Sequence, residues 1–373
     1  MVETMFNLKS LFLGIASILS VGVAHADLNF TCKNSTDLPK FEQKLFTKFH
    51  DLSISPHYLV SSKKNNTYSV SISFEESNTL QIFNSPYFKV KPEYVYINGK
   101  KTNTVSKKEI AVAYLYKGRV SEFEGDDCGL EKFEDSINLR QKIVAYAQNL
   151  SWEWPDGGPA KWNNSLWNKG TPLNKGLTFK ALADALTNQS QYEIGCYTAT
   201  KLVYAQAYAD FYKNDKKSPQ TILSVLWSDN DPLVDIEPDL FWKFEPDFEI
   251  KNQYAAGKLL KIHENVHAFN YIPGDWVYFW NTDPITYQKT GYEGSNAIYL
   301  GGNKFNDYYN DNEGSYSFEE KLDELFQWKN GVFSRSRHLN KIQPKNIQEL
   351  YQAATTPENG GYIIPNRLVP RVF

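Results

Sequence analysis

The sequence is poor in cysteine and histidine, has no excess of charge of either sign and has no long apolar run. Its 373 residues include 3 cysteines, 6 histidines, and 40 basic against 43 acidic side chains. This near balance of charge argues against a basic surface for nucleic acid, so we expect no nucleic-acid partner. An apolar content of 41%, rich in aromatic residues, indicates packed cores rather than disorder or a coiled coil.

The N-terminal residues have the pattern of an export signal. An apolar stretch from Leu11 to Val23 is followed by Ala24-His25-Ala26, a small-x-small cleavage pattern. The stretch is shorter than the roughly 20 residues that a membrane span requires. We therefore expect residues 1–26 to be a signal peptide, no membrane span, and a secreted or periplasmic protein.

The three cysteines of an exported chain leave one thiol over after a disulfide has formed. Cys32 and Cys128 enclose one β-rich region, so we expect these two to pair. Cys196 lies well downstream and is the candidate free thiol. The alternative for Cys196 is a buried, unreactive side chain.

The patterns along the chain predict a β-rich domain followed by a helix-then-strand domain. Alternation over residues 68–74 and 109–116 predicts strands, and Asn98-Gly99 predicts a tight hairpin. The domains that we expect are a β-rich N-terminal domain (27–135), a helix and Trp-rich connector (136–177), a catalytic domain (178–333) and a C-terminal tail with little signal (334–373). The elements that we expect are helices over 136–150, 179–186 and 318–328, the last capped by Ser317, and strands over 221–227, 276–279 and 297–300.

Cys196 has the local sequence of a reactive thiol. Small and apolar residues recur every four positions from Ala199 to Phe211, which predicts a helix that starts at Cys196. The unpaired N–H groups and the positive dipole end of a first turn favour a thiolate, and they also form an oxyanion hole. Gly195 leaves room for a carbonyl group to approach the sulfur.

Three motifs resemble the bacterial spore-coat-type transglutaminases. Residues 195–199 (Gly-Cys-Tyr-Thr-Ala) are similar to the nucleophile segment of that family. Residues 274–281 (Gly-Asp-Trp-Val-Tyr-Phe-Trp-Asn) and 294–301 (Gly-Ser-Asn-Ala-Ile-Tyr-Leu-Gly) resemble its two following strands. The order of helix and strands is also that of bacterial cell-wall cysteine peptidases, whose core the family shares.

The resemblance implies an α+β fold of the papain-like, cell-wall-cysteine-peptidase type, with the nucleophile at a helix N-terminus packed on an antiparallel sheet. It implies acyl transfer from glutamine side chains to lysine amines or to water through a Cys196 thioester. The partners would be proteins with exposed glutamine and lysine; we expect no metal, no cofactor and a monomer. By position in the motifs, Tyr197, Trp276, Ser295 and Asn296 are candidate substrate-binding residues.

The family's catalytic base is missing at its usual place. The glutamate of its Gly-Glu-Asn motif is replaced by Ser295, and the cell-wall peptidases have histidine there. Glu293 lies two residues earlier, and side chains two apart on a strand share a face. We therefore expect Glu293 to act as the base for Cys196. The alternative is that Glu293 is a solvated carboxylate and that the site is altered or inactive. The protein would then be a relative of the cell-wall peptidases or a non-enzymatic binding protein.

A second motif points to a different class of enzyme. His263-Glu264-Asn265-Val266-His267 reads H-E-x-x-H, which on a helix holds zinc in metallopeptidases. Glu319 or Asp323 is a candidate third ligand. Against this alternative, Pro273-Gly274 follows within two turns and Lys261 precedes the motif in a segment that should be buried.

Overall fold

The structure, a computed structural model, describes most of the chain outside the N-terminus. The described residues are 28–73, 90–116, 118–213, 259–263, 270–311, 314–335, 342–364 and 367–373. The expected signal peptide and the strand expected over 221–227 lie outside them. The described part combines helices and sheets, which confirms the predicted α+β class. In this part of the chain, no helix has the length and apolarity needed to cross a membrane.

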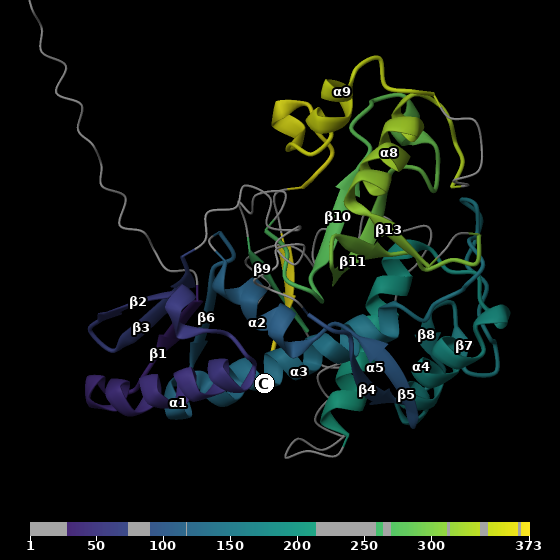
Figure 1. The fold of residues 1–373 in the computed structure, drawn as a ribbon. Coiled ribbons are helices and arrows are strands. Elements are labelled where there is room, and N and C mark those ends of the chain that lie inside the picture. The colour runs from purple at the N-terminus through teal and green to yellow at the C-terminus, as the bar shows by residue number, and fades with distance from the viewer. Residues whose placement is uncertain are drawn as a thin grey trace, which may run out of the picture.

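The N-terminal region is a four-stranded sheet covered by one helix (Figure 1). Its order is β2 (Leu59–Lys64), β3 (Thr67–Ile72), β1 (Leu28–Thr31) and β6 (Ser121–Glu124), and α1 (Leu38–Asp51) packs on it. Strand β3 buries alternate side chains from Tyr68 to Ile72, as the sequence pattern predicts. The disulfide between Cys32 and Cys128 ties this region together and confirms the expected pairing.

The β-hairpin at Asn98-Gly99 is confirmed. It joins β4 (Glu93–Ile97) to β5 (Lys100–Thr104), and both turn residues have positive φ, 49° and 76°. The Asn-Gly pair tolerates this conformation, which matches the twist of the two strands.

The strand predicted over residues 109–116 is wrong: the segment is helix α2 (Lys107–Leu115). All its residues from Glu109 to Leu115 are buried, so no polar face marks the helical period. A short apolar run of this kind fits either type of element. Ser106 decides for the helix locally, because its side chain accepts a hydrogen bond from the backbone N–H of Glu109.

Glu109 is a buried carboxyl group whose titration should affect stability. Its Oε1 accepts a hydrogen bond from the N–H of Gly302 at 2.7 Å, and burial raises its pKa to about 7. Between about pH 4.5 and 7 the folded chain therefore holds a proton that the unfolded chain has lost, so stability falls as the pH rises. We expect Glu109→Gln, which keeps the acceptor oxygen, to remove up to about 3 kcal/mol of this decrease.

The measurement is the free energy of unfolding of wild type and variant at several pH values across this window. Glu319→Gln, at an exposed glutamate, is the matched control. An equal pH dependence in wild type and in Glu109→Gln would contradict the assignment.

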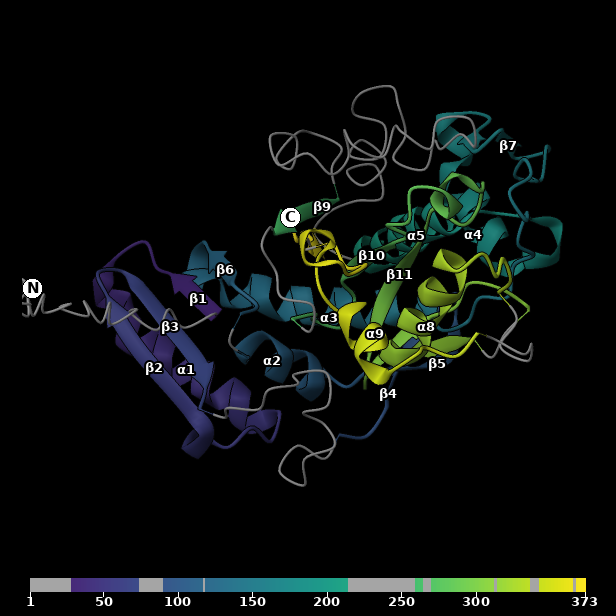
Figure 2. The ribbon, with the colours of Figure 1, turned by 90° about the horizontal axis from the view of Figure 1, so that it is seen from above.

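Three helices form the middle of the molecule. They are α3 (Leu130–Ala147), α4 (Thr178–Thr187) and α5 (Cys196–Tyr212). Helix α3 runs between the N-terminal sheet and the C-terminal sheet and packs against α5 (Figure 2). The helices expected over 136–150 and 179–186 are confirmed, although the first begins earlier, at Leu130. The Trp-rich segment that follows α3 is largely packed inside, with Trp152, Trp162 and Trp167 buried.

The C-terminal region is built on a six-stranded sheet. Its order is β13 (Ser315–Ser317), β12 (Lys304–Asn306), β11 (Gly294–Gly301), β10 (Trp276–Trp280), β14 (Arg367–Pro370) and β9 (Leu260–His263). Strands β10 and β11 are the expected pair and run antiparallel. Helix α8 (Phe318–Lys329) packs on β10, and α5 packs on β11. Ser317 caps α8 in a capping box with Glu320, which confirms the predicted start. The remaining elements are α9 (Ile347–Gln352) and the short pair β7 (Trp167–Asn168) and β8 (Thr171–Pro172).

The register of β10 and β11 gives each face of the sheet its own core. On one face Trp276 and Ile298 pair and join the core that contains α5. On the other face Val277 and Ala297 pair and join the core under α8. Adjacent residues of either strand therefore point to opposite helices.

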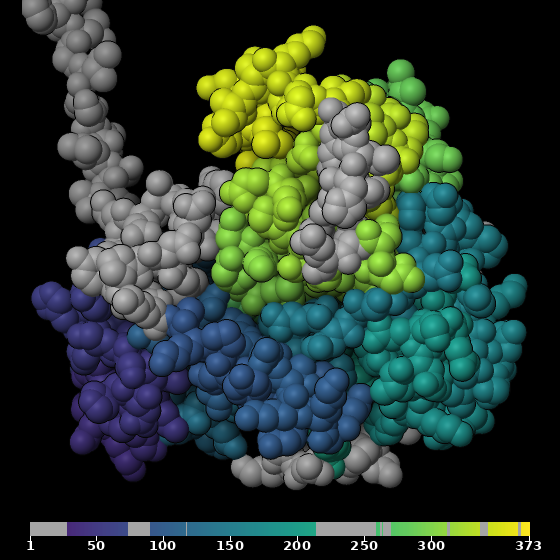
Figure 3. Space-filling view, turned by 45° about the vertical axis from the view of Figure 1, so that its right-hand side comes forward, coloured from purple at the N-terminus to yellow at the C-terminus, as the bar shows by residue number. Residues whose placement is uncertain are grey.

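The C-terminal segment, for which the sequence gives little signal, supplies a strand to this sheet. Strand β14 lies between β10 and β9, and all four of its residues are buried. The sequence did not indicate strand β14, because this strand contains Arg367 and a buried arginine is unusual. Here Arg367 forms an ion pair with Asp275, which is also buried, at 3.4 Å. On the face shown in Figure 3, the N-terminal region lies at one side and the helical region at the other.

Candidate active site

Cys196 is a free, partly exposed thiol in the first turn of α5. The N-cap residue Gly195 is extended, and its carbonyl oxygen accepts the first helical hydrogen bond, from the N–H of Ala199. The earlier N–H groups of the turn have no acceptor within the helix and carry its positive dipole end. A Cβ atom on Gly195 would meet nothing within 4 Å, so the space beside this residue is open. The expected helix start is confirmed.

Asn296 is the closest polar partner of the sulfur. Its backbone N–H and its side-chain Nδ2 both donate to Cys196 Sγ, at 3.4 Å and 3.5 Å. Asn296 reaches the thiol because it lies on the face of β11 that packs on α5. Two N–H donors on one sulfur suit a negatively charged thiolate.

Trp276 fixes the orientation of the Asn296 amide. Its Nε1–H donates to Asn296 Oδ1 at 2.9 Å, which leaves Nδ2 directed at the sulfur. The indole ring is stacked on Tyr204 and lies 5.5 Å from the ring of Tyr197. Both Trp276 and Tyr197 are buried, so their rings form a wall behind Asn296 rather than an exposed surface.

We expect Trp276→Phe to lower kcat about fivefold with little change in KM, since one hydrogen bond that orients Asn296 is worth about 1 kcal/mol. The measurement is the rate of amine incorporation into a glutamine-containing protein. Trp162→Phe, which alters a ring packed against Trp167, is the control. Equal kcat values for the two variants would show that the indole has no role in positioning.

Three tyrosines surround the thiol. Burial raises the pKa of Tyr278, Tyr308 and Tyr309, and the negative charge of a Cys196 thiolate raises each further. The hydroxyl of Tyr308 forms a short hydrogen bond with Thr200, which itself donates to the carbonyl oxygen of Cys196. The buried Tyr309 hydroxyl has no partner among the described residues. No pattern in the sequence indicates Tyr309, because it lies in a loop after β12.

Glu293 lies immediately before β11, and its carbonyl oxygen accepts a hydrogen bond from Asn281. Burial raises the pKa of its carboxyl group, and backbone N–H groups only partly oppose this shift. Its Oε2 atom is buried and has no partner within the described part of the chain. Such a carboxylate is a poor structural group and a good proton acceptor.

Tyr278 lies close enough to Cys196 and to Glu293 for the charge of each to act on its phenol. Burial raises its pKa most, and the two charges raise it further. Its hydroxyl group passes directly over Gly294, where an added Cβ would come within 2.3 Å of that oxygen. Gly294 is therefore needed to let the phenol reach this place.

Ser295 lies on the other face of β11. Its buried hydroxyl accepts a hydrogen bond from Lys321 Nζ of α8 at 2.7 Å, and Lys321 forms an ion pair with Glu324. Because Asn296 faces the thiol, its neighbour Ser295 must face α8. We therefore leave Ser295 out of the proposed site. A strand face shared with Ser295 no longer directs Glu293 at the thiol; Glu293 precedes β11, and its nearness to the site rests on its charge acting on Tyr278. Asp307 is likewise engaged away from the thiol, in a 2.7 Å ion pair with Arg335.

The zinc motif does not have the geometry that it requires. His263 is the last residue of strand β9 and pairs with Arg367, whereas the motif needs it on a helix. Burial and the charge of Arg367 lower the pKa of His263. Glu264 and His267 lie outside the described residues. No cluster of three or more His, Cys, Asp and Glu side chains suited to a metal ion occurs in the described part of the chain.

Two comparisons relate the chain to known proteins. The chain matches a family model described as protein-glutamine gamma-glutamyltransferase over residues 97–354. The transglutaminase from Geobacillus stearothermophilus, solved without its C-terminal extension, is similar with 16% sequence identity and a TM-score of 0.41. The alignment covers 65% of this chain and 94% of that one. Curated proteins yield no match. Since the family model spans more than half of the sequence, the chain belongs to the protein-glutamine gamma-glutamyltransferase, or transglutaminase, family.

Proposed function

We propose that the protein is a secreted transglutaminase in which the Cys196 thiol takes an acyl group from glutamine side chains. The observation that carries this proposal is the pair of Asn296 N–H donors on a thiol at a helix start. Both features stabilise the negatively charged sulfur that such a reaction needs. Family membership supports acyl transfer from protein glutamine in general, and the contacts around Cys196 support the roles of the individual residues.

The first half-reaction forms a thioester. The Cys196 proton passes to Glu293, and the sulfur attacks the carbon of the glutamine carboxamide. The backbone N–H groups of the first turn of α5, which have no acceptor within the helix, stabilise the oxyanion. The C–N bond then breaks, and the nitrogen leaves as ammonia after it takes the proton back from Glu293.

The second half-reaction releases the acyl group. A lysine amine attacks the thioester carbon, passes a proton to Glu293 and displaces the sulfur, which gives an isopeptide crosslink. Water in place of the amine gives glutamate, that is, deamidation. The buried aromatic surroundings of the sulfur favour the amine, because they limit the access of water.

Tyr278 is the proposed link between the base and the sulfur. Its phenol lies within electrostatic reach of both groups, and its raised pKa keeps it protonated. In the proposed relay it accepts the proton of the Cys196 thiol while it donates its own proton to Glu293. This relay assigns to Glu293, by way of Tyr278, the task that the family's glutamate would have at the place of Ser295.

Secretion is the second part of the proposal. The Cys32–Cys128 disulfide persists in an oxidising compartment, in line with the signal-peptide pattern of residues 1–26. We further propose that the enzyme is a monomer and that residues 178–333, with strand β14, form the catalytic part.

The test is incorporation of a fluorescent primary amine into a glutamine-rich protein, with ammonia release measured in parallel. A transglutaminase gives labelled protein and ammonia in equal amounts, and trapping at low amine concentration gives a Cys196 thioester adduct by mass spectrometry. Cleavage of cell-wall peptides without amine incorporation would favour the cysteine-peptidase alternative and refute the proposal.

A further inference from the structure

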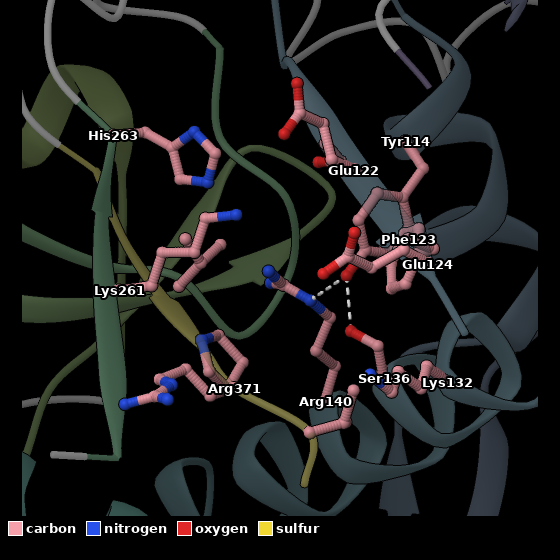
Figure 4. A pocket seen from close by; sticks show the side chains of 14 residues that line it. Tyr114, Glu122, Phe123, Glu124, Lys132, Ser136, Arg140, Lys261, His263 and Arg371 are labelled. Carbon is pink, nitrogen blue, oxygen red and sulfur yellow. Dashed lines mark hydrogen bonds between the residues drawn. The ribbon is translucent and has the colours of Figure 1, made fainter. Parts of the chain in front are cut away.

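A polar cavity of about 180 Å³ lies between the two sheets. It is bounded by β6 and α3 on one side and by β9 and β14 on the other, and β6 and β9 are edge strands (Figure 4). Its volume far exceeds the ~15 Å³ that a single water molecule needs. No residue of the proposed thiol site lines it.

The floor of the cavity is a fully buried arginine with an unused donor group. Arg140 donates from Nε to the hydroxyl of Tyr114 and from Nη1 to Pro273 O and Asp275 Oδ1. Its Nη2 atom is buried and has no hydrogen-bond partner among the described residues. A buried guanidinium group with an unpaired N–H₂ destabilises the folded state, and a hydrogen-bond acceptor on Nη2 would remove this cost.

One wall of the cavity is basic. Lys261 of β9 directs its ammonium group toward the centre of the cavity (Figure 4). Burial lowers the pKa of Lys261, and so do the charges of Arg367 and Arg371. The region around the floor is therefore rich in positive charge.

The opposite wall carries two carboxylates. Glu122 and Glu124 extend from β6 toward the cavity, and their charges act on Lys261 across it. Lys132 of α3 lies on the same side. Among the residues drawn in Figure 4, no hydrogen bond joins Lys261 to either carboxylate. The cavity thus presents Arg140, Lys261 and Arg371 on one side and two carboxylates beside Lys132 on the other.

We propose that this cavity binds a small zwitterion of the α-amino acid type. Its carboxylate would accept hydrogen bonds from Arg140 Nη2 and Lys261, and its ammonium group would lie beside Glu122 and Glu124. A plain anion would meet the two carboxylates, and a plain cation would meet Arg140 and Lys261. A molecule with both charges satisfies both walls.

The cavity is joined to the thiol site by a short chain of contacts. Arg140 holds Asp275 by a 2.7 Å ion pair in which both side chains are fully buried. Asp275 precedes Trp276, which orients the Asn296 amide on the sulfur. Occupancy of the cavity therefore bears on the start of β10, whose Trp276 orients the Asn296 amide of β11, although binding itself does not depend on the proposed function.

Glycine is the best probe, because it has both charges and no carboxamide for the thiol to attack; without a glutamine substrate no thioester forms that could react with its amine. We expect isothermal titration calorimetry of the full chain to show saturable binding of one glycine. Succinate, with two carboxylates, and putrescine, with two ammonium groups, should bind at least tenfold more weakly. Saturable binding of succinate or putrescine as tight as that of glycine would overturn the proposal.

Two sets of substitutions test the contribution of each wall to glycine binding. Lys261→Gln, and the double variant Glu122→Gln with Glu124→Gln, should each weaken glycine binding about tenfold, which corresponds to about 1.4 kcal/mol. Lys304→Gln, at an exposed lysine of β12, is the control and should bind glycine as wild type does. No saturable heat with wild type at millimolar glycine, or unchanged affinity in both wall variants, would overturn the proposal without affecting the assignment of Cys196.

Discussion

Cys196→Ala is expected to abolish amine incorporation, with a loss of at least about 10³-fold in kcat/KM. No other described side chain in the site is a free thiol, and the thioester cannot form without the sulfur. The measurement is the rate at which a fluorescent amine is incorporated into a glutamine-rich protein. Because Cys196 is partly exposed, its replacement by alanine leaves only a small space, and the melting temperature should change little.

The matched control is Cys196→Ser, which keeps the size of the side chain and a weak nucleophile. It should be as stable as wild type and nearly as inactive as the alanine variant, since an unassisted hydroxyl group is a poor nucleophile. Amine incorporation by Cys196→Ala at more than a tenth of the wild-type rate would contradict the thiol mechanism.

Glu293→Gln is expected to lower kcat by about 10²- to 10⁴-fold, because the amide cannot accept the thiol proton. Burial raises the pKa of Glu293 above its usual range, so the wild-type rate should rise with pH as this carboxyl group loses its proton. The variant should lose this ascending limb of the pH–rate profile. The measurement is kcat for amine incorporation as a function of pH.

Two further variants support the interpretation of that result. Tyr278→Phe should also lower kcat, since it breaks the link between Glu293 and the sulfur, and its effect should not add to that of Glu293→Gln. Glu319→Gln, at an exposed glutamate of α8, should have no effect on the rate. If Glu293→Gln kept the wild-type rate and pH profile, another group would have to be the base.

The candidate site divides into residues with a local sequence signal and residues without one. Cys196 was predictable, because a glycine, a thiol and a small-residue repeat of every four positions define a helix start within one short segment. The start of α8 was predictable for the same reason, since Ser317 and Glu320 form a capping box only three residues apart. Neither inference needs knowledge of distant residues.

The roles of Asn296 and Ser295 were not predictable in this way. The alternation of β11 shows that the two side chains leave opposite faces, but not which face packs on α5. The motif places Ser295 at the family's catalytic position, whereas the structure turns its hydroxyl to Lys321. Which face meets the thiol depends on how α5 and α8 sandwich the sheet.

Helix α2 and strand β14 show the same limit in the fold. The segment of α2 is apolar at almost every position, so the spacing of its apolar residues could not distinguish a helix from a strand. Strand β14 contains Arg367 and Pro370, which the sequence alone does not place in a sheet interior. The arginine is tolerated because Asp275, distant in sequence, lies beside it.

By itself, the sequence determined the α+β class of the chain, the disulfide pairing, the free thiol at a helix start and the two strands that follow it. These depend on composition and on periodicity along a short backbone segment. Only the tertiary structure shows which N–H groups donate to Cys196 Sγ, which tyrosines lie near it and how β14 joins the sheet. Those features result from contacts between segments far apart in the chain, whose geometry is set by the packing of whole helices on a sheet rather than by any local pattern.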